Sequence, residues 1–264
     1  MTIVEFLTSY WHFDAVPVFL AVALIAFQLI TNKNGSKHKN RVFFLGVATM
    51  LLVTISPLAY LGMGYLFSAH MVESIVLLLV VPSMLLNGLN EKVGEAIHQS
   101  WFGKVGDRLF SVPVAWMIGV GTMYFWHIPA VFEAMKMSHL LHEVHLLSLL
   151  VGGLIFKWPV FSPVEWKKLS PMQSAIYLFI ACVGCTVLGI FIAFGPADVF
   201  TPFFHGGNAA IWSMVRNGWG ISSVVDQQAA GLIMWVPACM IYITNVLTVL
   251  SAYLNSPYVE AEEI

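Results

Sequence analysis

Three histidines, His139, His142 and His145, lie within seven residues of one strongly apolar stretch of the sequence. Ionisable side chains are costly at membrane depth and tend to survive there only where they bind or relay something. Neutral imidazole is the commonest protein ligand for metal ions. On a helix, at about 100° per residue, the three side chains spread over an arc of roughly 120° and can face one interior. This stretch is therefore the first candidate for a functional site.

Other polar residues are expected at the same depth. His70 opens another apolar stretch, and Glu73 shares its helical face. His127 closes a third stretch, and Asp226 precedes the last one. Helices that each bring a His or Asp to one level are what a metal site in a bundle requires. Alternatively, the histidines are interfacial residues that hydrogen-bond headgroups and backbone carbonyls or hold helices together.

Sulfur ligands leave two interpretations open. Thioethers suit Cu(I), but methionine also fills irregular packing. Cys182, Cys185 and Cys239 are expected near the bilayer midplane, where thiolates would carry Cu(I). Ala181, Cys185 and Gly189 also form a series of small residues that lets helices pack closely. The methionines expected in the outer half are Met63, Met71, Met123, Met135, Met137, Met214 and Met234.

The composition places these residues in a membrane protein. The chain is 59% apolar and only 10% charged, with a mean hydropathy of +0.82. A helix needs about 20 apolar residues to cross a bilayer. We therefore expect an all-α polytopic bundle in one membrane domain, 1–264, with seven spans. These are roughly 14–31, 41–61, 70–88, 111–127, 139–158, 172–195 and 229–253.

The basic residues predict an orientation with the N-terminus outside and the C-terminus cytoplasmic, since cytoplasmic loops are enriched in Lys and Arg. In that orientation, only Lys136 and Arg216 lie outside. The ten inner ones are Lys33, Lys37, Lys39, Arg41, Lys92, Lys104, Arg108, Lys157, Lys167 and Lys168. An apolar stripe at four-residue spacing in 91–110 predicts a helix in the inner interface plane. The connection 196–228 is expected to fold back over the outer surface.

Several function classes are disfavoured. The sequence has no Gly-rich phosphate loop, no G-x-S-x-G nucleophile motif and no H-E-x-x-H zinc signature. A formal charge of −2 gives no sign of nucleic-acid binding. The last span has no lysine for a retinal Schiff base.

Four segments resemble, in order, the signature segments of the CtaG family of cytochrome c oxidase assembly factors linked to caa3 oxidases. The resemblance covers most of 40–250. The segments are AHMVESI at 69–75, FWHIPAVF at 125–132, the span from LHEVH at 141–145 to FKWPV at 156–160, and DQQAAGLIMWVP at 226–237. The last segment is the most specific.

The resemblance implies a bacterial inner (plasma) membrane protein, not an enzyme, that handles copper for the CuB centre of a haem-copper oxidase. An external donor would supply the copper. One motif departs from the family pattern: Ser74 stands where a second histidine is expected. Three explanations are open: Glu73 takes the place of that histidine as an oxygen ligand, His139 supplies the ligand instead, or the site itself is altered. The implied roles transfer to His70, Met71, His127, His142, His145 and Asp226, with His139 and Glu73 in support.

Two other readings remain. Histidines on facing helices can also ligate haem, as in an electron-transfer subunit. The chain can also be a structural subunit of a respiratory complex with no cofactor. Haem requires two histidines on opposite sides of a gap wide enough for the macrocycle, whereas a copper ion requires its histidine ligands close to one another.

Overall fold

The computed structural model describes residues 3–32, 36–99, 110–196, 199–200 and 208–255, and every regular element in these ranges is helical. The all-α prediction is confirmed. The elements run α1 (Ile3–Ser9), α2 (Ala15–Thr31), α3 (Lys37–Ile55), α4 (Pro57–Gly62), α5 (Phe67–Ile75), η1 (Val76–Val80), α6 (Val81–Gly88), α7 (Glu91–Gln99), α9 (Val112–Trp126), α10 (Pro129–Lys136), α11 (His139–Phe161), η2 (Glu165–Lys167), α12 (Pro171–Phe194), α13 (Ala209–Ser213), η4 (Met214–Gly218) and α14 (Ser223–Leu254).

Four helical stretches in the described residues are long and apolar enough to cross a membrane: Phe67–Gly88, His139–Phe161, Pro171–Phe194 and Ser223–Leu254. A fifth is added if α9 and α10, bent by 70°, count as one broken span. The protein is thus a multi-pass membrane protein. Seven spans are not shown, because α2 has only 17 residues and α3 begins with a basic first turn and ends at Ile55. The orientation also stays a prediction.

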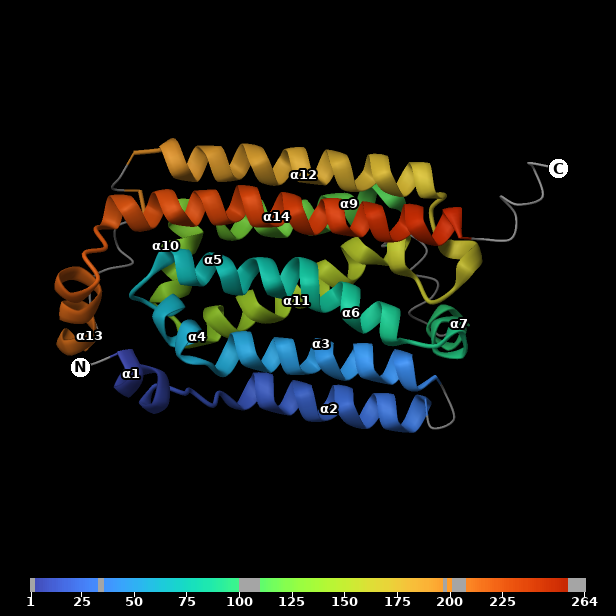
Figure 1. The fold of residues 1–264 in the computed structure, drawn as a ribbon, viewed down its shortest axis with the longest axis horizontal. Helices are drawn as coiled ribbons and strands as arrows, with labels where there is room; N and C mark the ends of the chain where they lie inside the picture. The colour runs from blue at the N-terminus through green and yellow to red at the C-terminus, as the bar shows by residue number, and fades with distance from the viewer. Residues whose placement is uncertain (1–2, 33–35, 100–109, 197–198, 201–207, 256–264) are drawn as a thin grey trace.

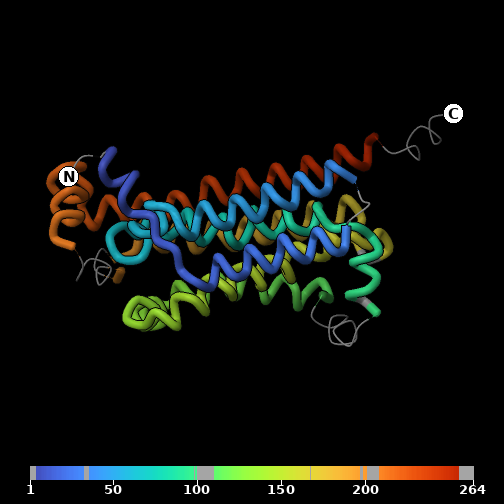
Figure 2. Tube along the Cα trace, turned by 90° about the horizontal axis from the view of Figure 1, so that it is seen from below, coloured from blue at the N-terminus to red at the C-terminus, as the bar shows by residue number. Residues whose placement is uncertain are grey.

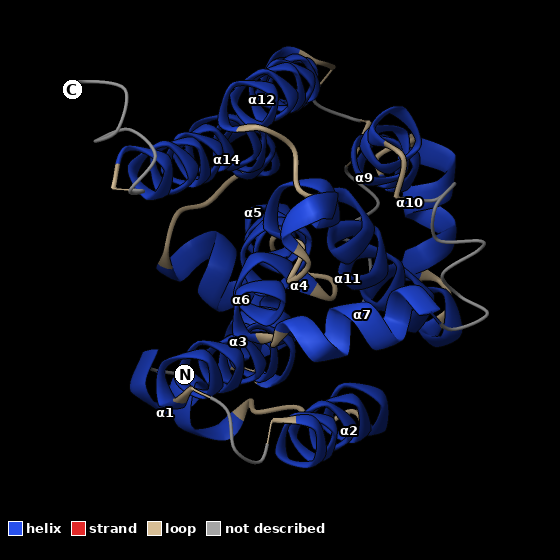
Figure 3. Ribbon diagram, turned by 90° about the vertical axis from the view of Figure 1, so that its right-hand side faces the viewer, coloured by secondary structure: helices blue, strands red, loops and turns tan. Residues whose placement is uncertain are grey.

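The chain surrounds two central helical segments, α5–η1–α6 and α11. Viewed from one end, both lie inside a ring formed by α2, α3, α9, α12 and α14 (Figure 3). Within the most apolar windows, 78% of Phe67–Gly88 and 67% of His139–Phe161 is buried, against 39% and 22% for α12 and α14. The two central segments carry His70, Glu73 and His145, and all three side chains are buried against protein.

The two central segments pack closely at a break in one of them. Pro82 has no N–H to donate to the carbonyl of Leu78, and the preceding turn is the π-helix η1. Gly153 of α11 lies against this break: a Cβ built on it would lie 2.4 Å from the Leu78 oxygen and 2.6 Å from Pro82 Cγ. Only glycine permits this approach without a backbone shift.

The short helices α1, α4, α10 and α13 gather at one end of the bundle, and α7 lies at the other (Figures 1 and 2). We call the first the N-terminal end. The described part of the 196–228 connection packs there, with Ile211 and Val215 in one cluster with Phe6 and Leu61. An interfacial helix is predicted within 91–110. The structure has α7 at Glu91–Gln99, and residues 100–109 lie outside the described residues.

Lys157 differs from its sequence-based placement. We counted it among the basic residues of the inner loops, but it lies within α11 and is fully buried. Its ammonium lies 5.3–5.9 Å from the ring centroids of Phe156, Phe161 and Tyr242. Lysine's long apolar stem and these aromatic faces allow such a position.

Candidate metal centre

His127 ends α9, immediately before the bend into α10 that Pro129 begins. Its Nδ1 lies 2.6 Å from the carbonyl oxygen of Met123, one of the last-turn carbonyls that a helix leaves without a partner. Because a carbonyl only accepts, Nδ1 must carry the proton and donate it. The lone pair of the neutral ring is therefore on Nε2, as in metal-ligating histidines whose other nitrogen is held by an acceptor.

His70 of α5 and His145 of α11 meet at the centre of the bundle. Their rings stack, with centroids 4.9 Å apart, and the His127 ring centroid lies 6.3 Å from that of His70. The rings of Trp126 and His145 are nearly perpendicular, with centroids 5.1 Å apart. The Trp126 indole N–H donates to Ser148, whose hydroxyl donates to the His145 carbonyl, so these bonds join the end of α9 to α11 beside His145.

Several buried polar atoms at this level have no hydrogen-bond partner among the residues that the structure describes. They include both ring nitrogens of His145, Nε2 of His127 and both carboxyl oxygens of Glu73. His145 is 0% exposed and Glu73 is 1% exposed. A buried polar group without a hydrogen bond costs about 1–3 kcal/mol, and an unpaired charge costs more. A bound cation would satisfy polar groups of this kind.

Further residues of interest lie on the same two helices, α5 and α11. His142, one helical turn before His145, has its ring centroid 6.1 Å from that of His145. Met71 and Ser74 are both buried in α5, and the Ser74 hydroxyl has no partner among the described residues. Glu143 is also buried, and both of its carboxyl oxygens lack a described partner.

Asp226 has a different environment. Its carboxylate accepts hydrogen bonds from the backbone N–H groups of Phe67, at 2.6 Å, and Ser68, at 3.0 Å, and from the Ser68 hydroxyl. It thus caps the N-terminus of α5 from α14, where the helix dipole also favours a negative charge. Asp226 fixes the level of the helix that carries His70 and Glu73.

A second group lies at the surface of the N-terminal end. His12 Nε2 lies 2.7 Å from Oδ1 of Asp14, and His139 Nε2 lies 3.5 Å from the same oxygen. These three residues form a group that could hold a metal ion. Sequence reasoning placed His12 outside the spans and did not single out Asp14. The sequence signal that could have found this group is the H-x-D spacing at the start of the first predicted span.

The two groups differ in how closely their ligand atoms gather. Among the residues that the structure describes, only the surface group has three or more His, Cys, Asp or Glu ligand atoms all within 4.8 Å of one another. In the central cluster, the rings of His70 and His145 are face to face. Sharing one ion there requires the rings to turn their nitrogens inward.

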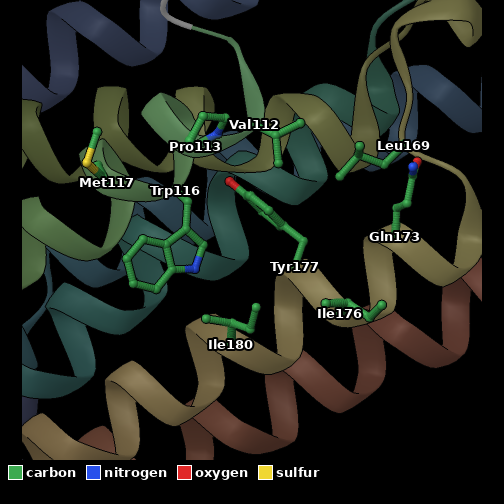
Figure 4. Close-up of a pocket in the computed structure, with 9 residues that line it drawn as sticks. All are labelled: Val112, Pro113, Trp116, Met117, Leu169, Gln173, Ile176, Tyr177 and Ile180. Carbon is green, nitrogen blue, oxygen red and sulfur yellow. The ribbon is translucent and has the colours of Figure 1, made fainter.

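Two further features lie elsewhere. An apolar cavity of about 480 Å³ lies between α9 and α12, lined by residues such as Trp116 and Tyr177 and by none of the histidines (Figure 4). The cysteines lie between α12 and α14: Cys182 Sγ is 2.6 Å from Cys239 Sγ, and Cys185 Sγ is 3.3 Å from the Tyr242 hydroxyl. Neither feature contacts the central cluster through any described hydrogen bond or ring contact.

Comparison with known proteins identifies the family. The family model of the cytochrome c oxidase caa3 assembly factor (Caa3_CtaG) matches residues 11–256. The chain belongs to this family. Neither a curated protein nor a solved structure matches it. The match starts just before His12, so all the site residues above fall within the Caa3_CtaG region.

Proposed function

We propose that this Caa3_CtaG protein carries copper on its way to the CuB centre of a haem-copper oxidase. It holds the ion at His70, His127 and His145, with Glu73 as the charged partner. The observation that carries the proposal is that buried Nε2 of His127, both ring nitrogens of His145 and both carboxyl oxygens of Glu73 have no hydrogen-bond partner among the described residues. A folded protein retains such a set where it serves function, because each member costs stability.

The chemistry of the set suits a copper ion. Imidazole is a good copper ligand, and Nε2 of His127 already presents its lone pair. The Glu73 carboxylate offsets the charge of a cation in a low-dielectric interior, where neither charge would be stable alone. In this proposal Glu73 fills the role that the family pattern gives to a histidine at position 74.

The other predicted residues support this centre. Asp226 holds α5 at the right level, Met71 offers a thioether on the same helix, and His142 and His139 line the approach to it. No step of bond-making catalysis is assigned to the protein: it receives copper from an external donor and passes it to an oxidase subunit docked beside it in the bacterial plasma membrane.

The stacked histidines bear on the haem alternative. A haem ligated by two histidines lies between their rings, which must stand on opposite faces of the macrocycle. The 4.9 Å stacking of His70 on His145 leaves no space for a macrocycle between them. This contact favours copper over haem.

Retention of copper by the purified protein tests the proposal. Wild type, His145→Ala and His38→Ala are exposed to Cu(I), challenged with a chelator and analysed for bound metal. His38 is exposed in the first turn of α3 and serves as the matched control. We expect wild type and His38→Ala to keep stoichiometric copper and His145→Ala to lose most of it.

A double variant sharpens the test. Ligands of one centre act as a unit, so adding His70→Ala to His145→Ala should cause little further loss. Full retention by His145→Ala would contradict the proposal, and a Soret band in the wild-type absorption spectrum would replace it with the haem reading.

A further inference from the structure

A cavity of about 170 Å³, lined by both polar and apolar residues, opens at the N-terminal end between α4, α10 and the start of α11. Its lining includes the thioethers of Met63 and Met135 and the imidazoles of His139 and His142. Thioether sulfur is a soft ligand that suits Cu(I), and imidazole binds copper in either oxidation state. The cavity therefore offers two kinds of copper ligand in one space.

The cavity lies between the surface group and the buried cluster. His139 belongs both to the cavity lining and to the surface group with His12 and Asp14. His142 also lines the cavity, and its ring lies 6.1 Å from that of His145, which in turn stacks on His70. A continuous series of possible ligands thus runs from the surface to the interior.

Exposure falls steadily along this series. The side chain of His139 is 66% exposed, His142 is partly buried, and His145 is fully buried. The three residues are three apart on one helix, so each step is about 4.5 Å along the axis. An ion can pass between neighbours by exchanging one ligand at a time, because each new bond to the ion forms before the old one breaks.

The charge of the lining selects among metals. Lys136 also lines the cavity, with its ammonium over the Phe132 ring at 5.8 Å. Burial lowers the pKa of Lys136 to about 7, and in its protonated form the ammonium repels a divalent ion twice as strongly as a monovalent one at the same distance. The combination of sulfur ligands with a lysine therefore disfavours Zn²⁺ and Cu²⁺ and favours Cu⁺.

We propose that this cavity is the loading path for Cu(I), which is received at His12, Asp14 and His139 and delivered through Met63, Met135 and His142 to His145. The inference rests on the proposed function, since it assumes that copper is held at the buried histidines. The oxidation state of copper does not change along this path, so no electron donor is required.

The test separates the rate of copper uptake from the amount retained. Purified protein receives Cu(I) from a coloured Cu(I)–chelator complex, and transfer is followed by the loss of the complex's absorbance. Met63→Leu/Met135→Leu removes both sulfurs with little change in volume. The matched control is Met137→Leu, since Met137 is 85% exposed and does not line the cavity.

We expect the double variant to take up Cu(I) at least about tenfold more slowly than wild type, equivalent to about 1.4 kcal/mol in the barrier, with the same final copper content. Met137→Leu should match wild type in both. Asp14→Asn should also slow uptake, which tests the surface group without touching the cavity. Unchanged uptake rates in the double variant and Asp14→Asn would overturn the loading path while leaving the buried centre intact. Failure of wild type to take up any Cu(I) would instead overturn the proposed function.

Discussion

Replacing Gly153 by alanine should destabilise the protein by separating the two central segments. The new Cβ would lie 2.4 Å from the Leu78 oxygen, and real Cβ atoms essentially never approach a neighbour within 3.0 Å. Relieving this contact requires a backbone shift of about 0.6 Å, because the atom it meets is backbone rather than a mobile side chain. Overpacking of this kind costs about 1–3 kcal/mol.

Gly121→Ala is the matched control. Gly121 also lies inside a helix, α9, but a Cβ there would meet nothing within 4 Å. Alanine at such a site is favoured over glycine by about 0.5–1 kcal/mol. Thermal unfolding of the detergent-solubilised protein, followed by tryptophan fluorescence, should therefore give a lower midpoint for Gly153→Ala and an equal or higher one for Gly121→Ala. Equal midpoints for Gly153→Ala and wild type would refute the close packing of α11 on η1.

Three further predictions address the cap, the buried lysine and the orientation. Asp226→Ala should destabilise the protein by about 1–3 kcal/mol, because it leaves N–H groups of α5 unpaired. Asp226→Asn keeps one acceptor, so its midpoint in the same thermal unfolding assay should lie between those of Asp226→Ala and wild type. Lys157→Met should be neutral or raise the midpoint, because it removes a buried ammonium that has no hydrogen-bond partner among the described residues; a large fall would show that the charge is needed. A reporter fused after Lys37 should behave as cytoplasmic and one in 205–220 as external, and finding both on one side would refute the predicted orientation.

The sequence predicts the fold class well because long apolar runs have few structural solutions in a membrane. Each predicted span corresponds to helical structure, including residues 41–61, which are split at Ser56 into α3 and α4. This split follows from Pro57, since the residue before a proline avoids helical geometry. Hydropathy could not predict which helices are central, because α12 has the higher mean hydropathy, 2.5 against 2.0 for Phe67–Gly88, although only the latter is enclosed.

The site is predictable in its residue types but not in its contacts. The three-residue spacing of His142 and His145 correctly places them on one helix, and burial at the centre follows from the two enclosed helices. The trans cap that Asp226 makes on α5 joins residues 158 or 159 apart, a separation that no local pattern encodes. His12 was missed for a related reason: its partner His139 is brought to it only by tertiary packing.

The metal content of the partner oxidase tests the central claim most directly. The oxidase is purified from cells that carry this protein as wild type, His127→Ala or the control His38→Ala, with equal amounts of each variant in the membrane. We expect the His127→Ala cells to yield oxidase with normal haem but deficient in copper, partly restored by excess copper, and the His38→Ala cells to yield normal enzyme. Fully metallated, active oxidase from His127→Ala cells would contradict the central claim.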